Sequence, residues 1–271
     1  MKAVRHGSIA LLIAILSATG CQTVQTTQAG IVGVHREQRM AVSEEAMESA
    51  ASKQYSQLMV EAAKKGKLNA DPAQYSRVKA IADKLIPQTT VFRADALRWK
   101  WEVNVLTSTE VNAWCMPGGK IAVYTGLIDK LKLTNDELAA VMGHEISHAL
   151  REHSRERASE QAIANLGISV LATVAGVGSL GQKGMEYAYQ GLLGLPNSRI
   201  HETEADRMGV ELAARAGYDP RAAISLWKKM GSAGGSEPPK FLSTHPPRAE
   251  RVRDLTDYAE KLMPVYQQAK K

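Results

Sequence analysis

Residues 134–150 read TNDELAAVMGHEISHAL, and this stretch decides the fold. Thr134 stands at a helix-capping position, and Glu137 follows three positions later. In this arrangement, a capping box, each side chain satisfies a backbone N–H group that the first helical turn would otherwise leave unpaired. The stretch therefore predicts a helix that begins directly after Thr134.

The predicted helix carries the pattern HExxH at His144, Glu145 and His148. Residues four apart on a helix are separated by about 400° of rotation, so the two imidazoles project from one face. They can bind one zinc ion. Glu145 is displaced by about 100° and can act as the general base on the attacking water without being a ligand. The pattern predicts the centre of a metallopeptidase site.

A catalytic zinc site needs a third protein ligand. His153 follows His148 by five residues, which is about 140° round a continuous helix. Arg151 stands where a glycine would have to break the helix for His153 to return. We therefore expect His153 to be a solvated surface side chain.

Glu202 and Asp206 are the better candidates, because they share one face of a second predicted helix. One of them can bind zinc while the other accepts the free ring N–H of a zinc-bound histidine. Glu204 falls on another face, and we expect it to be solvated. His201 is expected to be structural.

The first twenty residues resemble a secretory signal. Lys2 and Arg5 precede an apolar run at 9–16 and small residues at 17–20. Together with Cys21 the small residues look like a bacterial lipobox, in which the cysteine is acylated. Acyl chains on Cys21 would anchor the protein to a membrane.

This pattern also predicts the domain organisation. Residues 1–20 are expected to be the lipoprotein signal peptide, 21–34 a lipid-anchored tether, and 35–271 a single domain. Gln22 is not the aspartate that resembles an inner-membrane retention signal, so we expect the periplasmic face of the outer membrane.

Composition predicts a mainly α-helical chain with a small β-sheet, an α+β fold. The 271 residues are 44% hydrophobic, 23% charged and only 5% aromatic. The formal charge of +6 is mild, and no basic run is interleaved with aromatic residues. Nucleic-acid binding is therefore not expected. With Cys21 acylated, Cys115 would have no partner within the chain and is expected to be a buried hydrophobe.

Periodicity and turn residues place the remaining elements. The expected helices are 36–65, 72–86, 198–216, one beginning at 219 and a last one after 246–247, and the expected strands are 98–106 and 120–124. Residues 161–182 contain no charged side chain. The segment is compatible with a helical hairpin, a flap over the site or a membrane contact.

Further motifs surround this site in the sequence. They are Asn112 and Ala113 before Pro117 and Gly118, the HExxH motif, Glu202 with Ala205 and Asp206, and His245 and Pro246 with Arg251. Together they resemble the zinc metallopeptidase family of the CAAX prenyl protease and the HtpX heat-shock protease, in its soluble periplasmic lipoprotein branch.

The resemblance implies a zincin-like fold and a gluzincin-type endopeptidase with one zinc ion per chain. It assigns the metal ligands to His144, His148 and Glu202 and the general base to Glu145. Asp206 is then expected to orient His144 from behind the ligand shell.

Other residues are assigned roles as hypotheses. His245 either stabilises the oxyanion or occupies the open zinc position and keeps the enzyme latent. Arg251 supports the loop of His245 or the substrate. Asn112 is expected to contact substrate, and Lys120 belongs to a strand, 120–124, that could hold an extended substrate by strand addition.

The predicted function is cleavage of misfolded or envelope proteins in the periplasm. The alternative is a chaperone or assembly factor for outer-membrane proteins, with latent proteolysis and a possible partner in the outer-membrane assembly machinery. A structural zinc module is disfavoured, because three protein ligands leave a coordination position open.

Overall fold

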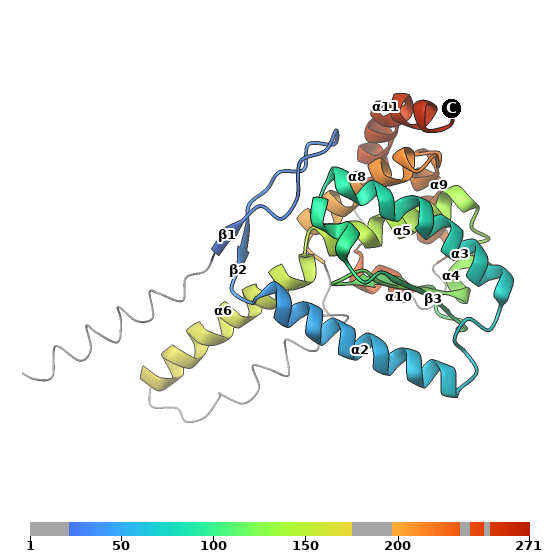
Figure 1. Ribbon diagram of the computed structural model, residues 1–271. Coiled ribbons are helices and arrows are strands. Elements are labelled where there is room, and N and C mark those ends of the chain that lie inside the picture. Colours follow the sequence, from blue (N-terminus) through green and yellow to red (C-terminus); the bar gives the residue numbers. More distant parts are fainter. Residues whose placement is uncertain (1–21, 175–196, 234–238, 247–249) are drawn as a thin grey trace, which may run out of the picture.

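The computed structural model describes residues 22–174, 197–233, 239–246 and 250–271 (Figure 1). The predicted signal peptide and Cys21 lie outside the described residues. The elements, in chain order, are β1 (Gln22–Val24), β2 (Gln38–Met40), α2 (Glu44–Lys64), α3 (Pro72–Leu85), η1 (Ile86–Val91), η2 (Ala94–Arg98), β3 (Glu102–Leu106), β4 (Ala113–Met116), β5 (Lys120–Tyr124), α4 (Thr125–Lys130), α5 (Asn135–Leu150), α6 (His153–Val174), α8 (Arg199–Arg215), α9 (Ala222–Ser232), α10 (Lys240–Thr244) and α11 (Arg251–Ala269). The predicted mainly helical fold with small sheets is confirmed.

The three-stranded sheet has the order β3-β5-β4. Central strand β5 pairs in parallel with β3, with Val103 opposite Ile121, and antiparallel with β4, with Cys115 opposite Ile121. The sequence predicted β5 within its observed bounds. It missed β4, because all four of its residues are buried and show no polar alternation.

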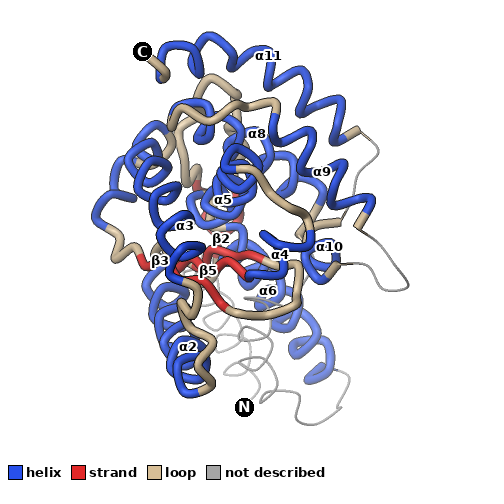
Figure 2. The backbone as a smooth tube through the Cα atoms, turned by 90° about the vertical axis from the view of Figure 1, so that its right-hand side faces the viewer, coloured by secondary structure: helices blue, strands red, loops and turns tan. Residues whose placement is uncertain are grey.

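Helix α5 lies in the centre of the molecule. It packs on β4 of the sheet and on α8 and α9 (Figure 1). Figure 2 shows α2 on the opposite side of the sheet from α5. There Tyr55 donates its hydroxyl hydrogen to the carbonyl of Ile121 and packs edge-on against Trp114. The active-site helix is thus held between a sheet and a second layer of helices.

The segment before α2 differs from its prediction. Residues 22–34 are not a tether: Val32 and Val34 are buried in the main core, and the Val32 N–H donates to Glu211 Oε2 at 3.0 Å. The helix predicted from residue 36 begins only at Glu44, capped by Ser43. An irregular segment packs by contacts with distant parts of the chain, so local periodicity does not reveal it.

The chain turns sharply after α5. Helix α5 ends at Leu150, Glu152 takes the left-handed conformation with φ +52°, and α6 starts at His153. Of the segment 161–182, the part up to residue 174 is helical and the rest lies outside the described residues. Among the described residues no helix combines the length and apolarity needed to cross a membrane.

Candidate active site

The helix that carries HExxH begins as predicted. The Thr134 hydroxyl accepts from the Glu137 N–H at 3.2 Å, and the Glu137 carboxylate accepts from the Thr134 N–H at 2.9 Å. Every residue of α5 from Glu137 to Leu150 is buried. The helix therefore presents its histidines to an enclosed site rather than to bulk water.

Helix α8 supplies the carboxylates. Its N-cap, Ser198, accepts a hydrogen bond from the His201 N–H at 3.2 Å, which sets the start of the helix within one turn of Glu202. Glu202 and Asp206 lie one turn apart and both are buried. The face of α8 that they share is turned toward α5, against which α8 packs.

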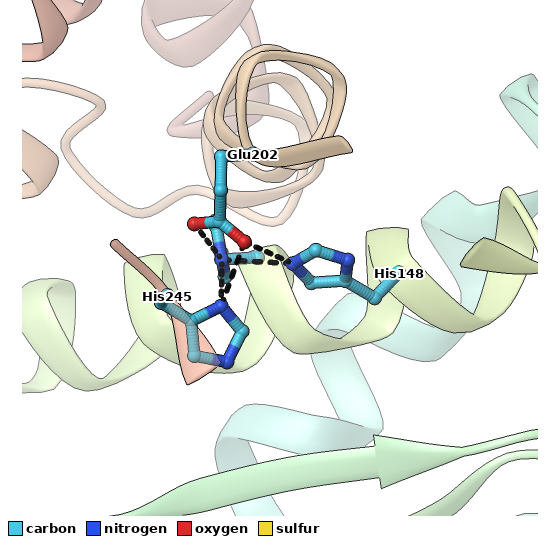
Figure 3. A group of neighbouring side chains, drawn as sticks. His148, Glu202 and His245 are labelled. Carbon is cyan, nitrogen blue, oxygen red and sulfur yellow. Dashed lines mark hydrogen bonds and ion pairs between the residues drawn. The ribbon is translucent and has the colours of Figure 1, made fainter. Parts of the chain in front are cut away.

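Four side chains converge on one point, namely His144, His148, Glu202 and His245. Figure 3 shows the Glu202 side chain extending from α8 between His148 of α5, on the right, and His245, at the lower left. The Nε2 atoms of His144 and His148 are 3.1 Å apart, and Glu202 Oε1 is 3.3 Å from His148 Nε2. Donors around a tetrahedral zinc ion are about 3.3–3.4 Å apart for bonds of about 2.0–2.1 Å. The predicted ligands therefore fit such an ion.

His245 belongs to the same donor set. Its Nδ1 lies 3.2 Å from His144 Nε2 and 2.9 Å from Glu202 Oε1. The ring stacks on Phe241 at a centroid distance of 4.2 Å, which holds it in place. Imidazole nitrogens this close repel unless a proton or a cation lies between them. The structure thus places His245 where a fourth ligand would be.

Buried ion pairs hold the carboxylates. His144 Nδ1 lies 3.0 Å from Asp206 Oδ1, so the predicted partner of His144 is in position. Arg251 donates to Asp206 Oδ2 at 2.7 Å and to Glu202 Oε2 at 2.5 Å, and its guanidinium lies over the Trp227 ring. Burial would raise the pKa of both carboxyl groups, but His245 and His148 lower that of Glu202, and Arg251 and His144 lower that of Asp206. Both carboxylates stay ionised.

Arg251 was expected to support either the loop of His245 or the substrate, and its contacts agree with the first of these roles. Its side chain is 2% exposed and lies behind the two carboxylates. It also donates to the Pro246 carbonyl at 3.5 Å, so it supports the loop of His245. Arg251 positions ligands and does not face substrate.

Glu145 faces the cleft that contains the donor set. Burial raises the pKa of its carboxyl, partly offset by the neighbouring histidines. Its Oε1 is buried without a hydrogen-bond partner and lies 3.4 Å from His245 Nε2. A buried carboxylate beside a metal site, with a raised pKa and an oxygen that accepts no hydrogen bond, is suited to accept a proton from water.

The cleft is also lined by Asn112 and by β4, including Cys115. The position of Asn112 agrees with its predicted role as a substrate contact. Lys120, which was also predicted to bind substrate, does not line the cleft. Lys120 lies on the central strand β5, is 5% exposed, and pairs with Glu102 at 2.7 Å. Both edges of β5 are occupied, so strand addition there is excluded.

Two further predictions on side chains were wrong. His153 is completely buried and lies 2.8 Å from His148, Nδ1 to Nδ1, because the turn at Glu152 brings it back to α5. Glu204 is buried as well, since Arg151 and the N-terminal Arg36 pair with it. His201 is buried against Glu156, which agrees with a structural role. Helix geometry alone did not reveal these contacts. One arises from the turn between α5 and α6, and the other from the segment before α2, which is far away in the sequence.

An HExxH helix opposed by a glutamate on a second helix defines a metallopeptidase. Residues 72–259 match the model of peptidase family M48, and the chain belongs to this family. The comparison shows the family and not the predicted lipoprotein branch.

Several proteins of this kind are similar to the chain. The mitochondrial metalloendopeptidase OMA1 of Arabidopsis thaliana is 37% identical over 171 residues, which cover 62% of this chain and 34% of that protein. The beta-barrel assembly-enhancing protease of Yersinia pestis is 28% identical over 205 residues, 72% of this chain and 40% of that protein. The metalloprotease YcaL of Escherichia coli is 28% identical over 154 residues, which cover 56% of this chain and 60% of that protein. The chain spans between a third and a half of the length of the mitochondrial relatives from plant, yeast and cattle.

Proposed function

We propose that this protein is a zinc-dependent endopeptidase that hydrolyses peptide bonds in misfolded or envelope proteins. The observation that carries the proposal is the convergence of His144, His148 and Glu202 on one point beside Glu145, whose buried Oε1 accepts no hydrogen bond. Two imidazoles and one carboxylate are one of the donor sets found in catalytic zinc sites.

A zinc ion at this point would act as a Lewis acid toward a peptide carbonyl and the attacking water. Glu145 accepts the proton of that water and later delivers it to the leaving amine. Burial raises the pKa of Glu145, which strengthens it as a base and lets it return the proton. Asp206 keeps the His144 ring oriented, and Arg251 pairs with both Asp206 and Glu202 and holds the two carboxylates in place.

The edge strand β4 offers the backbone groups that an extended substrate needs. Tyr124 N–H donates to the Asn112 carbonyl, and hydrogen-bonded pairs alternate along an antiparallel ladder. The N–H and C=O groups of Ala113 and Cys115 therefore point away from β5 into the cleft that Glu145 lines. Binding through the backbone makes cleavage tolerant of substrate sequence.

The proposed site of action is the periplasmic face of the outer membrane, with the chain anchored through a lipid on Cys21. The signal-like pattern of residues 1–20 supports this, as does the similarity to the beta-barrel assembly-enhancing protease of Yersinia pestis. Unfolded or misassembled envelope proteins are the substrates that this location would supply.

One observation favours the second candidate, a chaperone or assembly factor with latent proteolysis. With His245 beside the ligands, the site has four protein donors, which is the closed arrangement of structural zinc sites. Activity then requires that His245 move away. In this candidate the open coordination position is covered at rest, so proteolysis is latent.

The test is cleavage of an unfolded protein by the zinc-loaded full chain and by its Glu145→Gln variant at equal metal content. Loss of the general base should lower kcat by about 10²–10⁴-fold. Glu61→Gln, an exposed substitution on α2, serves as the control and should cleave like the wild type. Equal cleavage by the Glu145 variant would contradict the proposed mechanism.

A further inference from the structure

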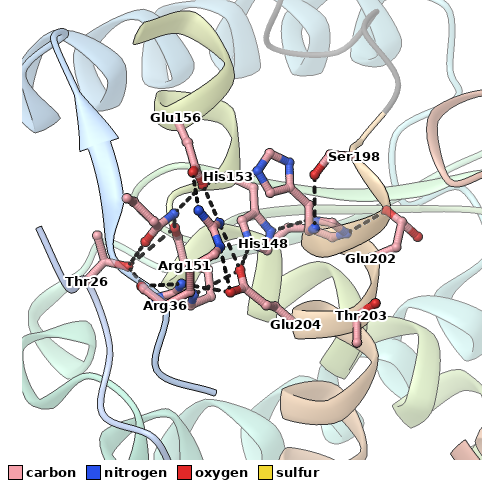
Figure 4. A network of polar contacts seen from close by, with 12 residues as sticks. Thr26, Arg36, His148, Arg151, His153, Glu156, Ser198, Glu202, Thr203 and Glu204 are labelled. Carbon is pink, nitrogen blue, oxygen red and sulfur yellow. Dashed lines mark hydrogen bonds and ion pairs between the residues drawn. The ribbon is translucent and has the colours of Figure 1, made fainter. Parts of the chain in front are cut away.

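A buried polar network lies directly behind the metal ligand His148 (Figure 4). His148 Nδ1, the ring nitrogen that faces away from the donor set, is 2.8 Å from His153 Nδ1. His153 Nε2 is in turn 2.9 Å from Glu204 Oε2. Both His153 and Glu204 are buried, and neither lines the substrate cleft.

The contacts determine where each proton lies. His148 must present the Nε2 lone pair to a metal, so its single N–H is on Nδ1. His153 Nδ1 then accepts that hydrogen and carries none. The N–H of His153 is therefore on Nε2, from which it donates to Glu204. The opposite tautomer of His153 would place two hydrogens between the rings or would move the His148 proton onto the metal-facing nitrogen.

Glu204 is itself fixed from two sides. Arg151 donates to its Oε1 at 3.0 Å, and Arg36 donates to the same oxygen at 3.1 Å. These guanidinium groups hold the carboxylate in one orientation. Arg36 lies in the N-terminal segment, so the folded segment before α2 completes the network.

A second metal site at this place can be set aside. His153, Glu156 and His201 lie close enough to hold an ion. However, Glu156 already accepts hydrogen bonds from Arg36, Gln38 and His201, and both nitrogens of His153 are engaged. Two guanidinium groups beside the cluster would also repel a cation. We therefore assign no second ion to this cluster.

We propose that His153 is a positioning residue that, with Glu204, fixes the tautomer and the ring orientation of the metal ligand His148. His144 receives the same support directly from a carboxylate, Asp206. His148 receives it through an inserted imidazole. The inference deepens the proposed function and rests on His148 being a metal ligand.

The first test measures zinc affinity by chelator competition. His153→Phe keeps a ring in the buried space and removes the acceptor, so the dissociation constant for zinc should rise about 10- to 100-fold. His153→Asn places an amide oxygen near the position of Nδ1 and should recover most of the loss. His201→Phe is the matched control, because His201 stacks on His153 at a centroid distance of 4.3 Å without contacting a ligand. It should bind zinc like the wild type.

The second test needs no variant. Long-range ¹⁵N–¹H NMR correlations of the zinc-loaded full chain should show His153 protonated only at Nε2 and His148 only at Nδ1. A hydrogen on His153 Nδ1 would overturn the proposal, as would equal losses of zinc affinity in the His153 and His201 variants.

Both readouts are independent of peptide cleavage. A wild type that binds zinc with these tautomers but cleaves nothing would refute the proposed function and leave the positioning role standing. Normal zinc affinity in His153→Phe, together with loss of cleavage in Glu145→Gln, would refute the positioning role alone.

Discussion

Gly143 and Gly209 lie against each other where α5 crosses α8. A Cβ atom on Gly143 would be 2.7 Å from the Gly209 carbonyl oxygen, and a Cβ on Gly209 would be 2.6 Å from the His144 nitrogen. Real Cβ atoms do not approach backbone this closely. The two glycines therefore set the separation between the helix of HExxH and the helix of Glu202.

Gly209→Ala should push the two helices apart. We expect a loss of about 1–3 kcal/mol in the free energy of unfolding from overpacking, and a weaker zinc affinity because Glu202 moves from His148. Gly231→Ala is the control, since nothing lies within 4 Å of its added Cβ. It should be neutral or stabilise α9 by about 0.5–1 kcal/mol. Urea unfolding and chelator competition measure both effects, and unchanged zinc affinity in Gly209→Ala would refute the spacing argument.

Arg251→Lys should weaken zinc binding about 10- to 100-fold. A lysine is a point charge and cannot bridge Glu202 and Asp206 as the planar guanidinium does. Arg207→Lys makes the matched change at a partly exposed pair, Arg207 with Asp254, which also joins α8 to α11. Zinc affinity should distinguish the two variants. Equal affinities would mean that Arg251 serves only to join the helices.

His245→Ala tests the latent arrangement. Since His245 lies at a ligand position, its removal should open a coordination site and raise the cleavage rate several-fold, while zinc affinity falls. His35→Ala removes an exposed histidine and serves as the control, which should leave the cleavage rate unchanged. A drop in kcat of about 10²–10³-fold at unchanged metal content would instead assign His245 to oxyanion stabilisation.

Val34→Ala tests whether the segment before α2 is part of the domain. Val34 is 4% exposed, so truncation should cost about 1–3 kcal/mol of unfolding free energy. Ile31→Ala, three residues away at a side chain that is 39% exposed, should cost much less. Chemical denaturation compares the two variants. Equal small losses would restore the interpretation of this segment as a tether.

Glu156→Gln should change the acid sensitivity of the fold. Burial alone would raise the pKa of Glu156, but hydrogen bonds from Arg36, His201 and Gln38 outweigh it and hold the pKa far below its ordinary value of 4.5. A depressed pKa stabilises the fold fully above that value, and the stabilisation is lost as the pH falls below it.

The wild type should therefore exceed Glu156→Gln by about 1–3 kcal/mol of unfolding free energy at pH 7, with the difference shrinking below about pH 4.5. Urea unfolding between pH 7 and pH 3 measures it. A difference that stays constant over this range would exclude Glu156 ionisation as its source.

Local rules predicted much of the catalytic helix. The capping box at Thr134 and the i, i+4 spacing of His144 and His148 depend only on neighbouring residues, and the structure shows both as expected. The same holds for α8, where Ser198 caps the helix and the left-handed Gly217 follows its end. Glu202 and Asp206 consequently share the face that the sequence indicated.

The errors arose where contacts join segments far apart in the chain. Strand β4 is buried, so its sequence carries no alternation, and only pairing with β5 defines it as the edge. The same pairing makes β5 central and removes Lys120 from substrate binding. The rotation argument for His153 failed because α5 ends at Leu150 and because Glu152, directly before His153, takes the left-handed conformation.

By itself, then, the sequence determined the helix of HExxH, the ligands on its face and the carboxylates of α8, because helix periodicity and capping act within a few residues. Only the tertiary structure decided which groups stand behind those ligands. Arg36 reaches Glu204 across 168 positions, and His245 reaches His144 across 101. Such contacts form because buried charges and polar rings must find partners when water is excluded, wherever in the chain those partners lie.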